Sequence, residues 1–419
     1  MASQFSDPFS SPKAYGLNKG NAAIIDLPVV GQGTVAVRAK VRESLSIKVK
    51  RDATESLHLR IGLGNISISI QDKKGEHHLD WSNLKTVDDR ASLLNPKRIT
   101  TYWLSIDKVN RRLRYGKHFL NKSMTLLESD LNAAMNNRYT WLEHSTYVDN
   151  AVDEDAGEPE VGVEEQPAEP SIAVLPLPVT IDLSPYIISQ DKVTLMELES
   201  GQFTVPSNLP EACQVLYGNV AGANITLNDK TFTKFSDAIE RSCSNPDGWC
   251  YQKLVEKASH VKDPLKTYIR ITIGYNQGNS PGVPYVLEIW PKDHYSSVHD
   301  HGNACAVIKV LCGQIDATYY DSLLDGHKIG IASLKKDDVT WLSPQNYQIH
   351  ELRNSYSTVC CTIQCYRYDE ENHVHHDKFD YIDDQGEVQE YSPTSDMAFY
   401  DFRQQMMAEW LKSGGQLVD

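Results

Sequence analysis

The sequence predicts a mainly β protein made of two domains, and three observations support this. Runs in which apolar and polar residues alternate recur in both halves of the chain, for example at residues 35–41 and 268–275, as in half-buried strands. A strongly acidic segment separates the two halves. At 419 residues the chain is also longer than one hydrophobic core usually serves. We therefore expect two β domains joined by a linker.

The first predicted domain covers residues 1–148 and is expected to be an antiparallel β-sandwich. Alternating runs at residues 35–41, 44–51, 56–63 and 65–72 are separated by Gly, Asn and Asp, at spacings typical of such a sandwich. A helix is expected near residues 124–135. The run ITTYWLSIDKVNRRLRYGKH resembles a repeated segment of the farnesoic acid methyltransferase-like β-sandwich modules, and this resemblance implies an accessory or binding domain rather than an enzyme.

The two halves differ in net charge, and an acidic segment between them predicts a linker. Residues 149–170 contain nine Asp or Glu, three Pro and no Lys or Arg, so we expect an acidic, disordered linker over residues 149–171. Before it lie 22 basic and 14 acidic residues, and after it 19 basic and 33 acidic. Basic clusters at residues 48–51 and 111–117 could attract an anionic partner or surface. The alternative is a strand edge that its charges protect from aggregation.

Composition also excludes several classes of protein. A net charge of −15 without an aromatic-interleaved basic stripe argues against nucleic-acid binding. No apolar run approaches eighteen residues and the N-terminus lacks the plan of a secretory signal, so we expect a cytoplasmic protein without a membrane segment. All eight cysteines lie in the second half at irregular spacings, which argues against a disulfide scaffold and against structural zinc.

The second predicted domain covers residues 172–419. Short extended runs up to residue 230 are followed by two expected helices, one through Phe235 and Ile239 and one through Leu254. A series of short strands then begins at residue 268, and residues 396–411 suggest a closing helix. Two helices followed by many strands predict a small antiparallel barrel capped by helices.

Three histidines in this half form a candidate metal site. His299 and His301 are two residues apart in SSVHDHGN, so on a strand their side chains would leave the same face. His350, at the start of a later expected strand, is a candidate third ligand. Three neutral imidazoles would leave open positions on an octahedral metal, as an oxygenase requires. The alternative is a pair of surface histidines.

The layout of HxH followed by a later HxxxN is that of the cupin barrels, and residues 232–368 resemble the cysteine dioxygenases, which are iron-dependent thiol dioxygenases of the cupin superfamily. The motifs are YIR at 268–270, SSVHDHGN at 296–303 and HELRN at 350–354. The resemblance implies Fe(II) bound by the three histidines. It also implies that Arg270 binds a substrate carboxylate and that the Tyr268 hydroxyl orients it. An arginine fork matches a carboxylate in two-point geometry.

One later strand departs from the family pattern. Where the family has a Ser-x-His-x-Tyr series, this chain has Thr362, Gln364 and Tyr366. The resemblance implies that Thr362 and Gln364 contact the substrate and that Tyr366 is catalytic and lies near bound oxygen, although Gln364 cannot carry a proton as histidine can. Tyr368 competes for the place of Tyr366 if the alignment gap lies elsewhere.

A thioether between cysteine and tyrosine occurs in some members of the family. Alignment without gaps puts Ala306 at the cysteine position and Cys305 one residue early. Because a shift of one residue on a strand turns a side chain to the other face, we expect no thioether between Cys305 and Tyr366 unless a bulge redirects Cys305.

The resemblance implies a dioxygenase that inserts both atoms of O2 into a small carboxylated thiol and produces a sulfinic acid. The expected partners are therefore a small thiol and O2, with L-cysteine as the first candidate substrate. Another thiol such as 3-mercaptopropionate is an alternative. A non-catalytic metal-binding cupin scaffold is a second alternative, of a different class.

Overall fold

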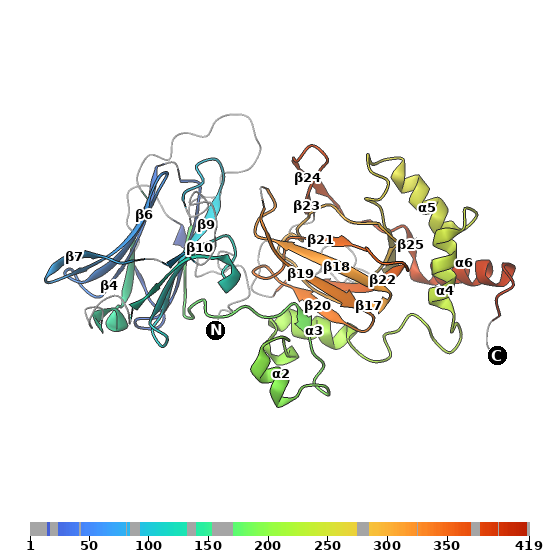
Figure 1. Ribbon diagram of the computed structural model, residues 1–419, viewed down its shortest axis with the longest axis horizontal. Helices are drawn as coiled ribbons and strands as arrows, with labels where there is room; N and C mark the ends of the chain where they lie inside the picture. The colour runs from blue at the N-terminus through green and yellow to red at the C-terminus, as the bar shows by residue number, and fades with distance from the viewer. Residues whose placement is uncertain are drawn as a thin grey trace. The chain divides into compact units, whose positions relative to one another are not determined.

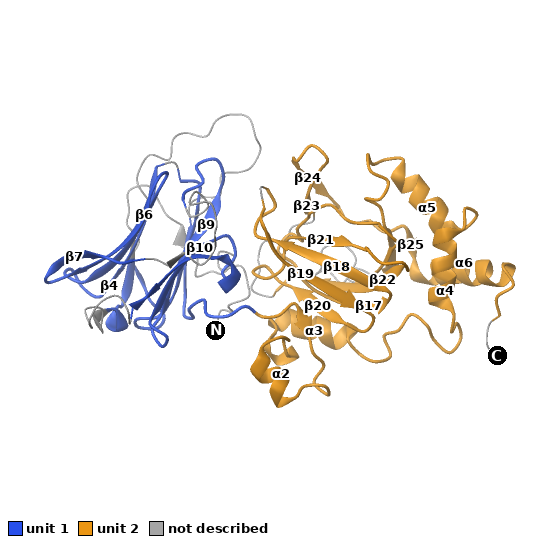
Figure 2. Cartoon of the chain, viewed as in Figure 1, with its two compact units in different colours: residues 1–182 blue, residues 183–419 orange. Residues whose placement is uncertain are grey.

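The computed structural model describes residues 15–16, 24–41, 43–80, 82–83, 93–131, 140–152, 171–274, 285–324, 326–369, 378–392 and 394–416. The chain divides into two compact units, residues 1–182 and 183–419 (Figure 2). Most of the predicted linker, residues 153–170, lies outside the described residues. The fold class of the described chain is mainly β, as predicted.

The first unit is an antiparallel sandwich of two sheets. The order in one sheet is β1 (Tyr15–Gly16), β13 (Ser171–Leu175), β3 (Gly33–Ala39), β9 (Thr100–Asp107), β10 (Arg112–Lys117), β11 (Thr125–Asp130) and β8 (Ser82–Asn83). The order in the other is β2 (Ile24–Asp26), β12 (Tyr147–Val152), β4 (Ser44–Lys50), β5 (Ser56–Gly62), β6 (Ile66–Asp72) and β7 (Gly75–His78). Two short 3-10 helices, Lys122–Met124 and Thr140–His144, connect strands.

Alternation along the strands builds the core of this unit. In β4 the side chains of Leu45, Ile47 and Val49 are buried, while Lys48 and Lys50 lie on the other face. The buried side chains pack with those of β3, β9 and β10 from the facing sheet. The period-two pattern therefore identified both the strands and their inner faces.

The second predicted basic cluster is largely paired with acidic side chains. Arg112 forms an ion pair with Asp130, with Nη1 and Oδ2 2.5 Å apart. Arg114 is buried, and its Nε donates to Glu128 at 2.6 Å. Acidic side chains of the same unit therefore neutralise part of this cluster.

Two details of the predicted first domain are wrong. The helix expected from residue 124 is instead strand β11 over Thr125–Asp130, because this segment pairs with β10; residues 132–139 lie outside the described part. The boundary predicted at residue 172 also differs, since β13 pairs with β3 and β1 in the first unit. This pairing joins residues that are far apart in the sequence.

The position of β13 leads to a prediction for limited proteolysis. The acidic composition of residues 153–170 predicts cleavage there. After such cleavage β13 remains covalently attached to the second unit but pairs with two strands of the first. We therefore expect the two fragments to elute together in native size-exclusion chromatography and to separate only in denaturant. Fragments that separate under native conditions would show that β13 does not hold them.

The second unit contains the predicted antiparallel barrel. One sheet has the order β14 (Tyr186–Ile187), β20 (Val339–Leu342), β17 (Cys305–Cys312), β22 (Cys360–Arg367), β16 (Tyr285–Trp290), β15 (Ile269–Ile273) and β25 (Met397–Ala398). The other has the order β19 (Lys328–Lys335), β18 (Gln314–Tyr320) and β21 (His350–Arg353). A hairpin is formed by β23 (Phe379–Ile382) and β24 (Val388–Tyr391).

Helices cover one face of the larger sheet (Figure 1). The predicted helices are present as α4 (Phe235–Ser244), α5 (Trp249–Ala258) and the closing α6 (Phe399–Lys412). The extended runs predicted before residue 230 are partly wrong, because they contain α2 (Leu195–Ser200), a 3-10 turn at Pro206–Asn208, and α3 (Glu211–Val220), which packs on β17 and β22. No helix in the described ranges has the length and apolar character needed to span a bilayer.

The two faces of the larger sheet differ in chemistry. Ile269, Ile271, Leu287 and Ile289 pack in the helix-side core. The alternate positions on β15, β16 and β22 face the other way, into the barrel, and include the buried polar residues Arg270, Glu288 and Gln364. Strand alternation therefore places a row of polar groups inside the barrel.

Candidate metal centre

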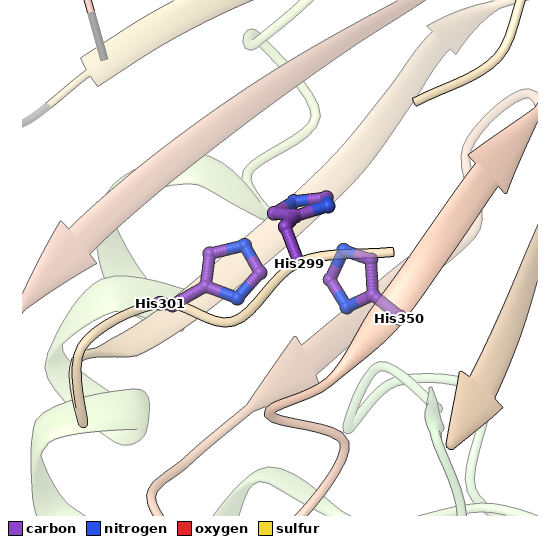
Figure 3. Close-up of side chains that lie close together, drawn as sticks. All are labelled: His299, His301 and His350. Atoms are coloured by element: carbon purple, nitrogen blue, oxygen red, sulfur yellow. The ribbon is translucent and has the colours of Figure 1, made fainter. Parts of the chain in front are cut away.

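Three buried imidazoles meet inside the barrel (Figure 3). His299, His301 and His350 are exposed by only 8%, 2% and 6%, and their ligand atoms all lie within 4.8 Å of one another. In the described part of the chain, this is the one group of three or more His, Cys, Asp or Glu side chains that could hold a metal ion. The sequence predicted all three members.

Backbone pairing brings the three histidines together. The His299 N–H donates to the His350 carbonyl at 3.0 Å, and the His350 N–H donates back to the His299 carbonyl at 3.1 Å. His301 follows two residues later, and its N–H donates to the Gln348 side chain at 2.9 Å. The expected strand through His299 and His301 is instead an extended segment with a bridge at His299, because β17 begins only at Cys305.

Each imidazole is oriented by a backbone carbonyl. The Nδ1 atom lies 2.9 Å from the Ser297 oxygen in His299 and 3.0 Å from the Gln348 oxygen in His301. In His350 it lies 3.2 Å from the Tyr347 oxygen. Since a carbonyl only accepts, Nδ1 carries the proton in each ring and Nε2 keeps its lone pair. Three rings fixed in this way are suited to coordinating a metal through Nε2.

Burial keeps the triad neutral. It lowers the pKa of His299 to about 4 and that of His350 to about 3. Burial, together with the two neighbouring histidines, holds the pKa of His301 well below its usual value. At neutral pH the three imidazoles are therefore uncharged, each with a single ring proton, which is the form that binds metal. The donor set fits a divalent metal with open coordination positions.

A small, largely enclosed pocket adjoins the triad and contains two opposite charges. Arg270 and Glu288 are register partners on β15 and β16, and both line this pocket. Arg270 Nη1 lies 3.7 Å from Glu288 Oε1. Burial raises the pKa of the Glu288 carboxyl, while the Arg270 charge acts in the opposite direction. Sequence analysis identified Arg270 and missed Glu288.

A hydrogen-bonded chain continues from Glu288 across the sheet. The Gln364 amide donates to Glu288 Oε2, and the Tyr366 hydroxyl donates to Gln364 Oε1. These contacts fix the Gln364 amide, because its nitrogen can only donate and its oxygen can only accept. Burial raises the pKa of Tyr366 well above its usual value, so the phenol stays protonated.

The other predicted site residues line either the metal pocket or an adjacent cavity. Tyr268 lines the pocket, stacks on Trp290 with ring centroids 4.1 Å apart, and burial raises its pKa to about 12. Thr362 lines an adjacent, mainly apolar cavity, and its buried hydroxyl has no hydrogen-bond partner in the described part of the chain. Tyr366 lines the pocket, whereas Tyr368 is buried outside its lining.

The position of Cys305 agrees with the expectation of no thioether. Ala306 pairs directly with Tyr366, while Cys305 pairs with Arg367. The Cys305 side chain packs in the helix-side core, and Tyr366 packs with Ala306 in the barrel. The two side chains therefore leave opposite faces of the sheet.

A wider cleft borders the pocket. It shares Tyr268, His299 and Tyr391 with the pocket. Lys266 and Asp384 also line it and form an ion pair with Nζ and Oδ1 2.5 Å apart. The cleft and the pocket therefore have part of their walls in common.

Comparisons with known proteins give a weak likeness in fold. No family model and no curated protein matches the chain. The Cnp3 cupin domain of Schizosaccharomyces pombe is 13% identical over 24% of this chain and 65% of its own, with a TM-score of 0.20. An oxalate oxidase in complex with the substrate analogue glycolate is 12% identical over 26% of this chain and 53% of its own, with a TM-score of 0.21.

The DMSP lyase DddQ of Ruegeria pomeroyi is 18% identical over 21% of this chain and 39% of its own, with a TM-score of 0.16. This chain thus covers less than two thirds of each of these three proteins. At such scores the likeness carries no argument about function.

Proposed function

We propose that the second unit is a non-haem Fe(II) thiol dioxygenase that oxidises a small carboxylated thiol, with L-cysteine as the first candidate, to its sulfinic acid. The observation that carries the proposal is the buried triad of neutral imidazoles with free Nε2 atoms, next to a pocket that contains a buried arginine. The reaction is balanced without a further reductant, because both atoms of O2 end in the sulfinate.

His299, His301 and His350 would hold the metal. A ferrous ion bound there would supply the redox chemistry that joins thiolate and dioxygen. An all-histidine set adds no negative charge, so a substrate that brings its own anionic sulfur complements it. The Nδ1 contacts to backbone carbonyls would keep the three rings in place during turnover.

The pocket side chains would bind and orient the thiol. Arg270 would hold the carboxylate, because a buried guanidinium is a strong, directional partner for it. Tyr268, next to Arg270, would orient the same end of the substrate. Tyr366, held by Gln364, would present its hydroxyl oxygen at the reacting end. The burial of these groups excludes water from the reaction.

Oxygen uptake with a panel of thiols tests this proposal. The full chain is loaded anaerobically with Fe(II), and oxygen consumption is followed with L-cysteine, 3-mercaptopropionate and cysteamine. We expect consumption that depends on both iron and thiol, with one O2 used per sulfinate formed. Iron binding with no oxygen uptake for any thiol would favour a non-catalytic cupin scaffold instead.

A further inference from the structure

We propose that Glu288 forms a subsite for a substrate ammonium group, so that the pocket selects a zwitterionic aminothiol carboxylate. This inference rests on the proposed function and names a specificity-determining residue for it. Glu288 is 3% exposed, and its neighbours along β16 are apolar. Burying a carboxylate costs free energy, which suggests that Glu288 has a role in the pocket.

The geometry leaves both charges available to a ligand. The 3.7 Å between Arg270 Nη1 and Glu288 Oε1 is longer than a hydrogen bond. Arg270 Nε is buried and finds no hydrogen-bond acceptor among the residues that the structure describes, so this atom keeps its donor capacity. The Gln364 amide donates to Oε2 of Glu288, and Oε1 faces Arg270 at the distance of an ion pair that is too long for a hydrogen bond. Oε1 is therefore the carboxylate atom that a ligand ammonium would contact.

Charge balance then decides which thiol fits. Without ligand, the two buried charges compensate each other. 3-Mercaptopropionate has a carboxylate but no ammonium. Its carboxylate would pair with Arg270, and the Glu288 carboxylate would then lie beside a second anion without a compensating cation. Cysteamine has only the ammonium, so it would pair with Glu288 and leave the Arg270 charge uncompensated. A zwitterion compensates both charges, so the pair discriminates against each singly charged thiol.

The Gln364 amide also holds Glu288 in position for this role. It joins Glu288 to Tyr366, and both residues line the metal pocket. An ammonium bound at Oε1 would therefore sit at a fixed place relative to the reacting end of the substrate. This predicts that the amine contributes to orientation as well as to affinity.

Anaerobic calorimetry on the Fe(II)-loaded full chain tests the subsite without turnover. Dissociation constants are measured for L-cysteine, 3-mercaptopropionate and cysteamine. We expect the wild-type protein to bind cysteine at least about tenfold more tightly than either other thiol. In Glu288→Gln the preference for cysteine over 3-mercaptopropionate should fall about tenfold or more, while Glu288→Asp, which keeps the charge, should retain it.

The ratio of dissociation constants within one variant does not depend on the folded fraction. The matched control is Glu128→Gln, which removes a carboxylate beside the buried Arg114 in the first unit and should leave all ratios unchanged. Equal binding of cysteine and 3-mercaptopropionate by the wild type, or an unchanged ratio in Glu288→Gln, would overturn the subsite. Binding in the expected order without sulfinate after oxygen is admitted would instead overturn the proposed reaction.

Discussion

His301→Ala is expected to purify with almost no bound metal and no detectable thiol oxidation. His301 is the most deeply buried ligand of the triad, and its loss leaves two imidazoles around a cavity. Loss of a supporting contact to a ligand already costs about 10–100-fold in metal affinity, so loss of the ligand itself should exceed that range. Elemental analysis after equilibration with Fe(II) gives the stoichiometry, which we expect to fall from near one per chain to near zero.

A second histidine variant controls for nonspecific effects. His327 is exposed in the same unit and contacts Asp321 near the surface, so His327→Ala should retain full metal content. Circular dichroism of both variants establishes that they fold. Full iron stoichiometry in folded His301→Ala would refute the three-histidine assignment.

Arg270→Ala is expected to lower the catalytic efficiency with cysteine by about 30- to 3000-fold. The estimate follows from a loss of about 2–5 kcal/mol for a truncated partner in a buried charge pair, at about 1.4 kcal/mol per decade. Cysteamine lacks the carboxylate, so the catalytic efficiency with cysteamine should change little, or rise because Glu288 is no longer paired with Arg270. Steady-state oxygen uptake with both thiols measures the two effects in one preparation.

This variant also leaves Glu288 buried without its cation, which is expected to cost about 3–5 kcal/mol of stability. The comparison between the two thiols is unaffected by a smaller folded fraction. The control is Arg353→Ala, since this half-exposed arginine stacks on Tyr295 and does not line the pocket. Equal losses with cysteine and cysteamine would mean that Arg270 supports the fold and does not recognise the carboxylate.

Much of the candidate site could be predicted because its signals are local. His299 and His301 are two residues apart, and His350 begins a strand, so residue type and spacing were enough to propose the triad. The barrel strands follow from alternation within β15, β16 and β22. The sequence could not show that backbone pairing of His299 with His350 closes the site, because strand order is a property of the fold.

Glu288 shows what sequence reasoning missed. In YVLEIW it is the only charged residue of a strand whose neighbours are buried on both faces, which is a signal for a paired or functional carboxylate. Its partner Arg270 is its register partner on the neighbouring strand, and register is not visible in either segment alone. The boundary error at β13 has the same cause, because that strand pairs with β3 far back in the sequence.

The most direct test of the account is oxygen-isotope labelling of the product. Iron-loaded protein is given L-cysteine under ¹⁸O2, and the product is analysed by mass spectrometry, with His301→Ala as the blank. We expect a cysteine sulfinate that carries two ¹⁸O atoms in the native protein and no labelled product in the variant. Unlabelled or singly labelled sulfinate, or no sulfinate from protein with one iron per chain, would contradict the proposed dioxygenase.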